Sequence, residues 1–347
     1  MTEQVNRRWI YARPLEGALA IGHFAREDAP VPTLRQGQAL VRTRLISIDP
    51  ANRLYFAMQA YRPQLRLGDV MAGFGIGEVV ASTDPRFRVG DLWHGDFGWQ
   101  DYAVLNSYDR NEFTYRCTPD TDDDALLGLY GITGMTAWFG VDLLVRPGAG
   151  QTAVVAGASG ACGGLIAQLL RSRGFRVIGL AGGDANCARV RADFGIEAID
   201  YRAPDLGERL AAACPEGVDF FSDGAGGVVS CATLPLMKPG AVWYHYGNLA
   251  DYDRIVPGQP IPRNDGFLTP ELRALCKERG LRPSFFVVFD HYCRRPEAEA
   301  SLRALHAAGQ IIAPTTTLEG FENLPRALVD GAFGAQRGKF GKLNLRP

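Results

Sequence analysis

The chain has 347 residues, which is enough for two domains that each bury a core of their own. Its 37 basic and 38 acidic residues are mixed along the chain and leave a net charge of −1, so the charge favours neither nucleic acid nor a membrane as a partner. Seven cysteines are scattered without C-x-x-C spacing, and the start MTEQVNRRW lacks the apolar core of a signal peptide, so we expect reduced thiols in the cytoplasm.

Residues 1–125 predict a β-rich domain with few helices. Residues 39–48 alternate apolar and polar side chains, as a half-buried strand does. Shorter strand-like runs follow at 76–81, 92–93 and 102–105, and Gly, Pro and Asp turns separate them.

Residues 125–141 carry no charge and are nearly long enough to span a membrane. They include four glycines and two threonines, and a strand and a helix follow directly. We therefore expect a buried helix here, not a membrane anchor.

A glycine turn follows the apolar run at 153–156, which is typical of a strand buried on both faces. Gly157, Gly160 and Gly163 form the pattern G-x-x-G-x-x-G, and an apolar-periodic helix begins after them. The first glycine permits a tight turn, the second lets backbone N–H groups approach phosphates, and the third lets helix and strand pack closely. Because the helix N-terminus adds unpaired donors, the stretch predicts a dinucleotide site.

Further strands alternate with helices up to residue 244. The expected strands are 176–180, 196–199, 218–221 and 241–244, and the clearest helix is 186–194. This alternation predicts an α/β domain over residues 126–310, with a doubly wound parallel sheet and right-handed crossovers. Since ligands bind at the carboxyl ends of such strands, the glycine turn should meet residues 182–183, 222–227 and 247–252.

The last part of the chain predicts more strands. Residues 284–289 are a hydrophobic run, and an apolar strand at a sheet edge invites pairing with another chain. Residues 311–318 and 342–345 predict strands that flank a helix at 324–330. We expect residues 311–347 to complete the first domain.

Neither a metal site nor a nucleophile is indicated. The five histidines are dispersed, no cysteines are paired as in structural zinc sites, and His94 is interpreted as structural or solvent-facing. Ser159 imitates the G-x-S-x-G turn of hydrolases, but position 161 is alanine. Its hydroxyl is better suited to a phosphate or to the backbone.

Several motifs follow one another in an order that spans nearly the whole chain. They are N-R-R-W at 6–9, S-I-D-P-A-N-R at 47–53, G-I-G-E-V-V-A-S at 75–82, G-W-Q-D-Y at 98–102, G-I-T-G-M-T-A-W at 131–138, the glycine turn, Gly226-Gly227 and F-G-K at 340–342. Together they resemble the medium-chain dehydrogenase/reductase superfamily, and within it the zinc-independent branch of NADPH-dependent alkenal and enone reductases. The resemblance implies a Rossmann domain with a GroES-like β-rich domain, NADPH as cofactor, a small unsaturated carbonyl as substrate, and a homodimer joined at residues 284–289.

The resemblance also implies which residues act. Hydride from the nicotinamide would reach the β-carbon of the substrate, and a donor near the carbonyl oxygen would stabilise the resulting enolate. Tyr252 matches the family's tyrosine donor, although a half-buried loop tyrosine is the alternative. Ala51 and Arg53 fall in the substrate pocket. The expected cofactor-binding residues are Thr136, Gly157, Ser159, Gly160, Ala161, Cys162, Gly163, Gly182, Gly183, Asn186, Tyr201, Asp223, Gly247, Tyr252 and Lys339.

The end of the second strand of this sheet bears on cofactor choice. Residues 181–183 are Ala-Gly-Gly, without the carboxylate that bonds the ribose 2′-hydroxyl in NAD enzymes. The family uses a lysine and a tyrosine near the 2′-phosphate; Asn186 replaces the lysine, and Tyr201 is kept. The missing charge could come from Arg189, Arg191 or Arg202.

Three departures from the family leave the substrate open. Ala51 replaces a tyrosine, Asp223 stands in a changed glycine stretch, and Lys339 replaces a frequent asparagine. Quinone reduction on the same scaffold and a non-catalytic NADPH-binding protein are the alternative functions.

Overall fold

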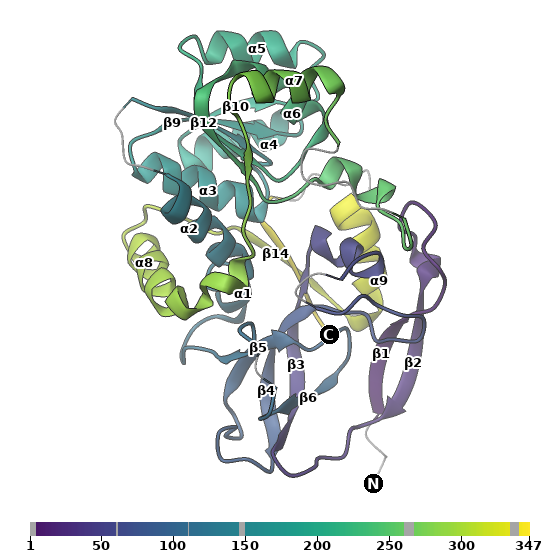
Figure 1. Cartoon of the computed structure of the whole chain (residues 1–347). Coiled ribbons are helices and arrows are strands. Elements are labelled where there is room, and N and C mark those ends of the chain that lie inside the picture. Colours follow the sequence, from purple (N-terminus) through teal and green to yellow (C-terminus); the bar gives the residue numbers. More distant parts are fainter. Residues whose placement is uncertain (1–4, 60–61, 110, 146–149, 260–266, 334–339) are drawn as a thin grey trace.

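The computed structural model describes residues 5–59, 62–109, 111–145, 150–259, 267–333 and 340–347. A parallel sheet with its helices forms one half of the molecule, and a mainly antiparallel sheet forms the other (Figure 1). Strand β14 (Thr315–Glu319), late in the sequence, belongs to the antiparallel half.

The parallel sheet has six strands in the order β10-β9-β8-β11-β12-β13, and all neighbours are parallel. Because the chain passes from β8 to β9 and β10 on one side and then to β11 on the other, this is the doubly wound order. The predicted parallel sheet is confirmed. Its strands are β8 (Thr152–Ala156), β9 (Arg176–Ala181), β10 (Glu197–Asp200), β11 (Val218–Asp223), β12 (Met237–His245) and β13 (Pro283–Ser284).

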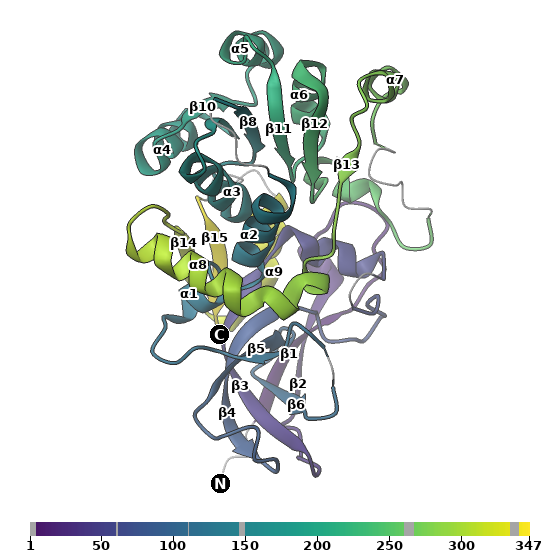
Figure 2. The ribbon, with the colours of Figure 1, turned by 60° about the vertical axis from the view of Figure 1, so that its left-hand side comes forward.

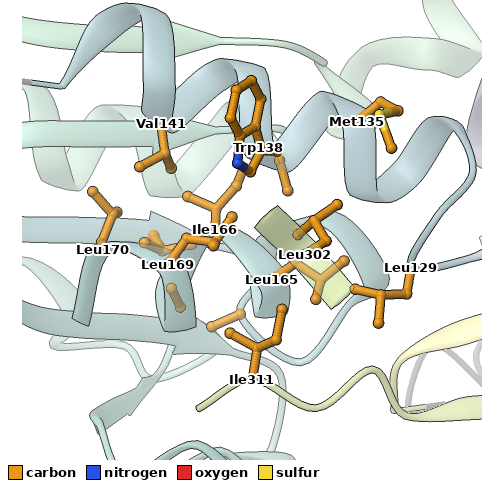
Figure 3. Packing of buried hydrophobic residues seen from close by; sticks show 14 of the residues in the cluster. Leu129, Met135, Trp138, Val141, Leu165, Ile166, Leu169, Leu170, Leu302 and Ile311 are labelled. Atoms are coloured by element: carbon orange, nitrogen blue, oxygen red, sulfur yellow. The ribbon is translucent and has the colours of Figure 1, made fainter. Parts of the chain in front are cut away.

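Helices cover both faces of this sheet because strand side chains alternate between the faces. Ala153 and Val155 belong to one apolar cluster with α2 and α3, whereas Val154 and Ala156 belong to another with α5, α6 and α7. Figure 3 shows the packing between α2 and α3, and Figure 2 shows α8 alongside α2. The helices are α2 (Ile132–Leu144), α3 (Ala161–Ser172), α4 (Asp184–Phe194), α5 (Leu206–Ala213), α6 (Gly227–Thr233), α7 (Pro270–Glu278) and α8 (Arg295–Ala307).

The second large sheet has the order β14-β15-β3-β4-β5-β7, with β6 also paired to β3. Its two latest strands are parallel to each other, and β15 is antiparallel to β3. The domain boundaries at 125/126 and 310/311 stay a prediction. The remaining strands are β1 (Val5–Tyr11), β2 (Phe24–Pro30), β3 (Gln38–Ile48), β4 (Phe74–Ser82), β5 (Leu92–Asp96), β6 (Tyr102–Asn106), β7 (Tyr115–Arg116) and β15 (Lys342–Arg346).

We predicted one buried helix for the apolar stretch 125–141, but the structure divides this stretch between two helices. α1 (Asp123–Leu127) ends at Gly128, and α2 begins after Gly131. A Cβ on Gly134 would lie 1.7 Å from the Leu129 carbonyl oxygen, so the backbone turns back tightly on itself between the helices. No helix in the described part of the chain is long and apolar enough to cross a membrane.

Two late strands are shorter than predicted. Only Ser284 of the run 284–289 lies in β13, and Val288 and Phe289 begin the 3-10 helix η5 (Val288–Arg294). The run leaves the sheet because Phe289 packs against Phe74 and Phe113 of the other half. Of the predicted strand 311–318, residues 311–314 belong to no strand. The helix predicted at 324–330 is a short α9 (Leu324–Arg326) continued by a π-helix, Ala327–Phe333.

Candidate functional site

The glycine turn after β8 has the geometry that its sequence predicts. Gly157 has a φ of +64°, which favours glycine, and Gly160 is the N-cap of α3. A Cβ on Gly163 would lie 2.4 Å from the Gly157 carbonyl oxygen, so only glycine allows α3 to pack this closely on the turn. The first-turn N–H groups of α3 are therefore held beside the turn, as an anion site requires.

The C-terminal segment is attached to this turn. The Gly341 N–H donates to the Ser159 carbonyl oxygen at 2.8 Å, and Gly160 and Gly341 form an isolated parallel bridge. Gly341 has a φ of +85°, and a Cβ there would lie 1.8 Å from the Pro314 carbonyl oxygen. The contact thus depends on glycine and joins the two halves of the molecule at the candidate site.

A cavity of about 600 Å³ opens at the carboxyl ends of the parallel strands. This volume is within the range of small-ligand and cofactor sites. Of the sequence-predicted residues, it brings together Gly157, Ser159, Gly160, Ala161, Gly182, Asn186 and Tyr201. The other lining residues are Ile48, Asp49, Pro50, Ala225, Gly226, Gly227, Val228, Val229, Leu249, Ala250, Asp251, Gly331, Gly341, Lys342 and Leu343.

One end of the cavity lies where β9 meets α4. The buried Asn186 side chain donates its Nδ2 hydrogen to the Gly182 carbonyl oxygen at 3.1 Å. The Gly183 N–H donates to Asp200 Oδ1 at 2.9 Å. A Cβ on Gly182 would lie 3.0 Å from the Tyr201 hydroxyl oxygen, so the tyrosine covers a space that glycine leaves open.

A buried lysine that sequence reasoning did not assign to the site lines the same cavity. Lys342 Nζ donates to Ser47 Oγ and to Asp49 Oδ1, each at 2.5 Å, and Ser47 also hydrogen-bonds Asp49. A charged residue beside the apolar strand residues 343 and 345 signals a buried partner. The sequence pattern does not show that the partner is Asp49, because Lys342 and Asp49 are 293 positions apart.

Asp223 lies behind the cavity wall. Its carboxylate is fully buried and accepts hydrogen bonds from the N–H groups of Ala225 and Gly226 and from Ser230 Oγ. It therefore shapes the loop whose residues 225–227 line the cavity. Its predicted contact with the cofactor stays a prediction.

Tyr252 also lies outside the lining, on the 3-10 helix η4 (Leu249–Arg254), and is 8% exposed. Burial raises the pKa of its hydroxyl to about 12, and a hydrogen bond with the Asn248 backbone partly opposes that shift. A Cβ on Gly247 would lie 3.4 Å from this hydroxyl. The hydroxyl therefore faces the turn after β12 as a protonated donor, and its catalytic role stays a prediction.

The two predicted substrate-pocket residues lie on the 3-10 helix η2 (Pro50–Phe56). Ala51 packs against the apolar cluster of the antiparallel half. Arg53 is fully buried; its Nη2 donates to the Gly17 carbonyl oxygen at 2.8 Å, and its Nε lies 3.7 Å from Asp253 Oδ1. Burial lowers the pKa of this guanidinium. Neither residue lines the cavity, so their roles stay predictions.

The remaining predicted residues do not line the cavity. These are Thr136, Cys162, Gly163, Gly183 and Gly247. Cys162 is half-buried, and burial raises its pKa to about 12, so its thiol stays protonated. Lys339 lies outside the described residues.

No group of three His, Cys, Asp or Glu side chains in the described ranges is arranged to hold a metal ion. His94, interpreted as structural or solvent-facing, is fully buried and packs between Phe74 and Tyr115. It is therefore structural.

The cavity fits a dinucleotide. The open glycine turn with the α3 N-terminus suits a diphosphate, and residues 182, 186 and 201 offer a polar end for an adenosine ribose. The part of the cavity lined by residues 225–227 and 249–251 is then left to hold the nicotinamide half of the dinucleotide.

Comparison with known proteins extends this picture to the whole chain. Residues 7–112 match the family model described as the N-terminal domain of oxidoreductase. NADPH-dependent curcumin reductase from Escherichia coli (strain K12) is 31% identical over 99% of this chain and 97% of its own length. 2-Alkenal reductase (NADP(+)-dependent) from Nicotiana tabacum is 29% identical over 86% of this chain and 85% of its own.

A solved structure agrees with the described fold. CurA from Vibrio vulnificus in complex with NADPH is 30% identical, with a TM-score of 0.87 over 98% of each chain. The Rossmann sheet with its glycine turn, the β-rich half and these end-to-end similarities lead to one assignment. The chain belongs to the medium-chain dehydrogenase/reductase superfamily, in its zinc-independent branch of alkenal and enone reductases.

Proposed function

We propose that the protein is an NADPH-dependent reductase that saturates the activated C=C bond of an α,β-unsaturated carbonyl compound. The observation that carries this proposal is the cavity at the carboxyl ends of β8, β9 and β11, where the glycine turn and residues 182, 186 and 201 meet. Two relatives support it: one is an NADPH-dependent curcumin reductase, and the other is an NADP(+)-dependent 2-alkenal reductase.

Bound NADPH would supply a hydride to the β-carbon, and a proton completes the saturated product. The chain contributes binding and electrostatics. N–H groups of the glycine turn and of the α3 N-terminus hold the diphosphate. The Tyr252 hydroxyl, which burial keeps protonated, would donate toward the carbonyl oxygen as it gains negative charge.

NADPH should bind more tightly than NADH. No carboxylate side chain follows β9 at residues 181–183, and Tyr201 lines this end of the cavity. Loss of the family lysine at Asn186 removes one charge-assisted hydrogen bond, worth roughly 1.5–3 kcal/mol, so a modest preference is expected. Equal or tighter NADH binding in a fluorescence titration would contradict this expectation.

We further propose a homodimer in a reducing cytoplasm. β13 is the last strand in the order of the parallel sheet, and Phe285 beside it is 58% exposed, which supports pairing of two chains there. The seven cysteines all lie in the described residues and form no disulfide with one another, which supports a reducing compartment.

Stopped-flow oxidation of NADPH tests the function directly. The purified protein is mixed with NADPH and a panel of enones, 2-alkenals and quinones, and product analysis checks that the C=C bond is saturated. We expect turnover with enones or alkenals. Turnover restricted to quinones would favour quinone reduction, and tight NADPH binding without turnover would favour a non-catalytic binding protein.

A further inference from the structure

The 2′-phosphate of NADPH requires positive charge at the β9 end of the cavity. A phosphate monoester carries about −1.5 to −2 charges at neutral pH, and charge-assisted hydrogen bonds bind it best. Asn186 is neutral, and its Nδ2 already bonds the Gly182 carbonyl oxygen. Lys342, the basic residue among the lining residues described, pairs with Asp49. The charge must come from a residue just outside the lining.

Two of the three candidate arginines are engaged elsewhere. Arg189 stacks on Phe340, with its guanidinium carbon 3.9 Å from the ring centroid, and its Nε lies 3.5 Å from Asp193 Oδ2. Arg191 Nη2 donates to the Ala198 carbonyl oxygen at 2.7 Å, beside the middle of β10. Neither contact is directed to the turn after β9.

Arg202 lies at that turn. Its backbone N–H donates to Asp200 Oδ1 at 2.9 Å, and the same oxygen accepts the Gly183 N–H, so one carboxylate ties the two turns together. A Cβ on Gly182 would lie 3.1 Å from Arg202 Nε and 3.0 Å from the Tyr201 hydroxyl oxygen. The guanidinium and the hydroxyl therefore lie against the same side of a glycine that lines the cavity.

Two acidic residues oppose this arrangement. Burial raises the pKa of Asp200, but hydrogen bonds from the Gly183 and Arg202 backbones, with the Arg202 charge, outweigh burial and lower it overall. Asp200 thus stays ionised, and its two backbone donors and the Arg202 charge compensate it. Asp184 in the first turn of α4 adds a second negative charge. The Arg209 charge also acts on both carboxylates, so Arg202 does not offset them alone.

We propose that Arg202, with the Tyr201 hydroxyl, binds the 2′-phosphate and sets the preference for NADPH over NADH. In the family, a lysine at the position of Asn186 on α4 carries this charge. In this chain, Arg202 in the turn after β10 would carry it instead. This inference rests on the proposed NADPH dependence. The inference names the residue of this chain that creates the preference for NADPH.

Calorimetric titration with 2′,5′-ADP and 5′-AMP tests the assignment without any turnover. The two probes differ by the 2′-phosphate. In R202A, the affinity for 2′,5′-ADP should fall roughly tenfold to a hundredfold, while 5′-AMP should bind as before. R189A is the matched control, since it also removes one arginine charge, and it should preserve both affinities. R202K should retain part of the 2′,5′-ADP affinity.

A compensating variant gives a second test. Adding N186K to R202A returns a positive charge to α4 and should recover part of the lost 2′,5′-ADP affinity. If wild type prefers 2′,5′-ADP and R202A keeps that preference, the Arg202 assignment is wrong while NADPH dependence stands. If wild type itself binds both probes equally, the NADPH preference fails. Loss of 5′-AMP binding in R202A along with 2′,5′-ADP would also overturn a role specific to the 2′-phosphate.

Discussion

The hydroxyl of Tyr252 is enclosed beside the turn at Gly247, where a small change isolates one hydrogen bond. Tyr252→Phe keeps the ring packed against Ala57 and Ile255 and removes only the donor. Single-turnover NADPH oxidation with an enone should slow about tenfold to a hundredfold, because the donor acts on charge that develops in the transition state. NADPH affinity should change little.

Tyr108→Phe is the control for this substitution, since Tyr108 is 74% exposed and does not line the cavity. An unchanged single-turnover rate in Tyr252→Phe, with hydride transfer shown to be rate-limiting, would make Tyr252 a packing residue. Because burial raises the Tyr252 pKa to about 12, its donor function should not titrate between about pH 6 and 9.

His94 makes the fold sensitive to acid. Burial lowers its pKa to about 4, and its Nδ1 lies 2.8 Å from the Phe113 carbonyl oxygen. As pH falls below the ordinary value of 6.5, the unfolded chain takes up this proton first, so stability is lost between about pH 6.5 and 4. At about pH 5 the loss from this residue should be on the order of 2 kcal/mol.

Urea unfolding of wild type and His94→Asn at about pH 7.5 and 5 measures this contribution. The variant should be less stable at the higher pH but lose less stability on acidification. His23→Asn is the control, at a position where the side chain is accessible. It should lose as much stability on acidification as wild type does. Equal acid losses in wild type and His94→Asn would assign the sensitivity to other groups.

At the scale of elements, the contact between β8 and α3 depends on the absence of one side chain. Gly163→Ala would place a Cβ 2.4 Å from the Gly157 carbonyl oxygen and 2.8 Å from that of Ala156, both of them backbone atoms. The helix must move, so unfolding free energy should fall by roughly 1–3 kcal/mol and nucleotide affinity should fall with it.

Gly207→Ala in α5 is the opposite case, because a Cβ there meets nothing within 4 Å. It should be neutral or stabilise by up to about 1 kcal/mol through helix propensity. Denaturant unfolding of both variants separates packing from propensity. A Gly163→Ala protein as stable as wild type would show that α3 can shift without cost.

The same elements show what sequence patterns can and cannot predict. β8, its glycine turn and α3 follow from residues close together in the chain, because the φ at Gly157 and the helix start are local properties. The pairing of Lys342 with Asp49 depends on where distant strands meet, so periodicity carries no signal for it. The run 284–289 was apolar enough for an edge strand, but Phe289 contacts a different layer and draws the chain out of the sheet.

At the scale of the whole molecule, Phe285 next to the edge strand β13 tests assembly. Phe285→Glu would bring a charge into the proposed interface, so the homodimer should dissociate to monomers at micromolar concentration in light scattering. Val89→Glu, at a position 68% exposed on a distant turn, should leave the mass unchanged. A wild-type monomer, or a dimer unaffected by Phe285→Glu, would contradict this interface.

The place of β15 between β14 and β3 has a consequence for biosynthesis. Ser47 on β3 meets Lys342 on β15 across 295 positions of the chain, so the ribosome makes one partner long before the other. During that interval one edge of β3 carries backbone groups whose final partner has not yet been translated, and such edges pair readily with other nascent chains. Fast translation, or a chaperone bound over residues 38–48, should therefore raise the yield of native protein in the cell. In the folded protein this edge of β3 is paired with β15.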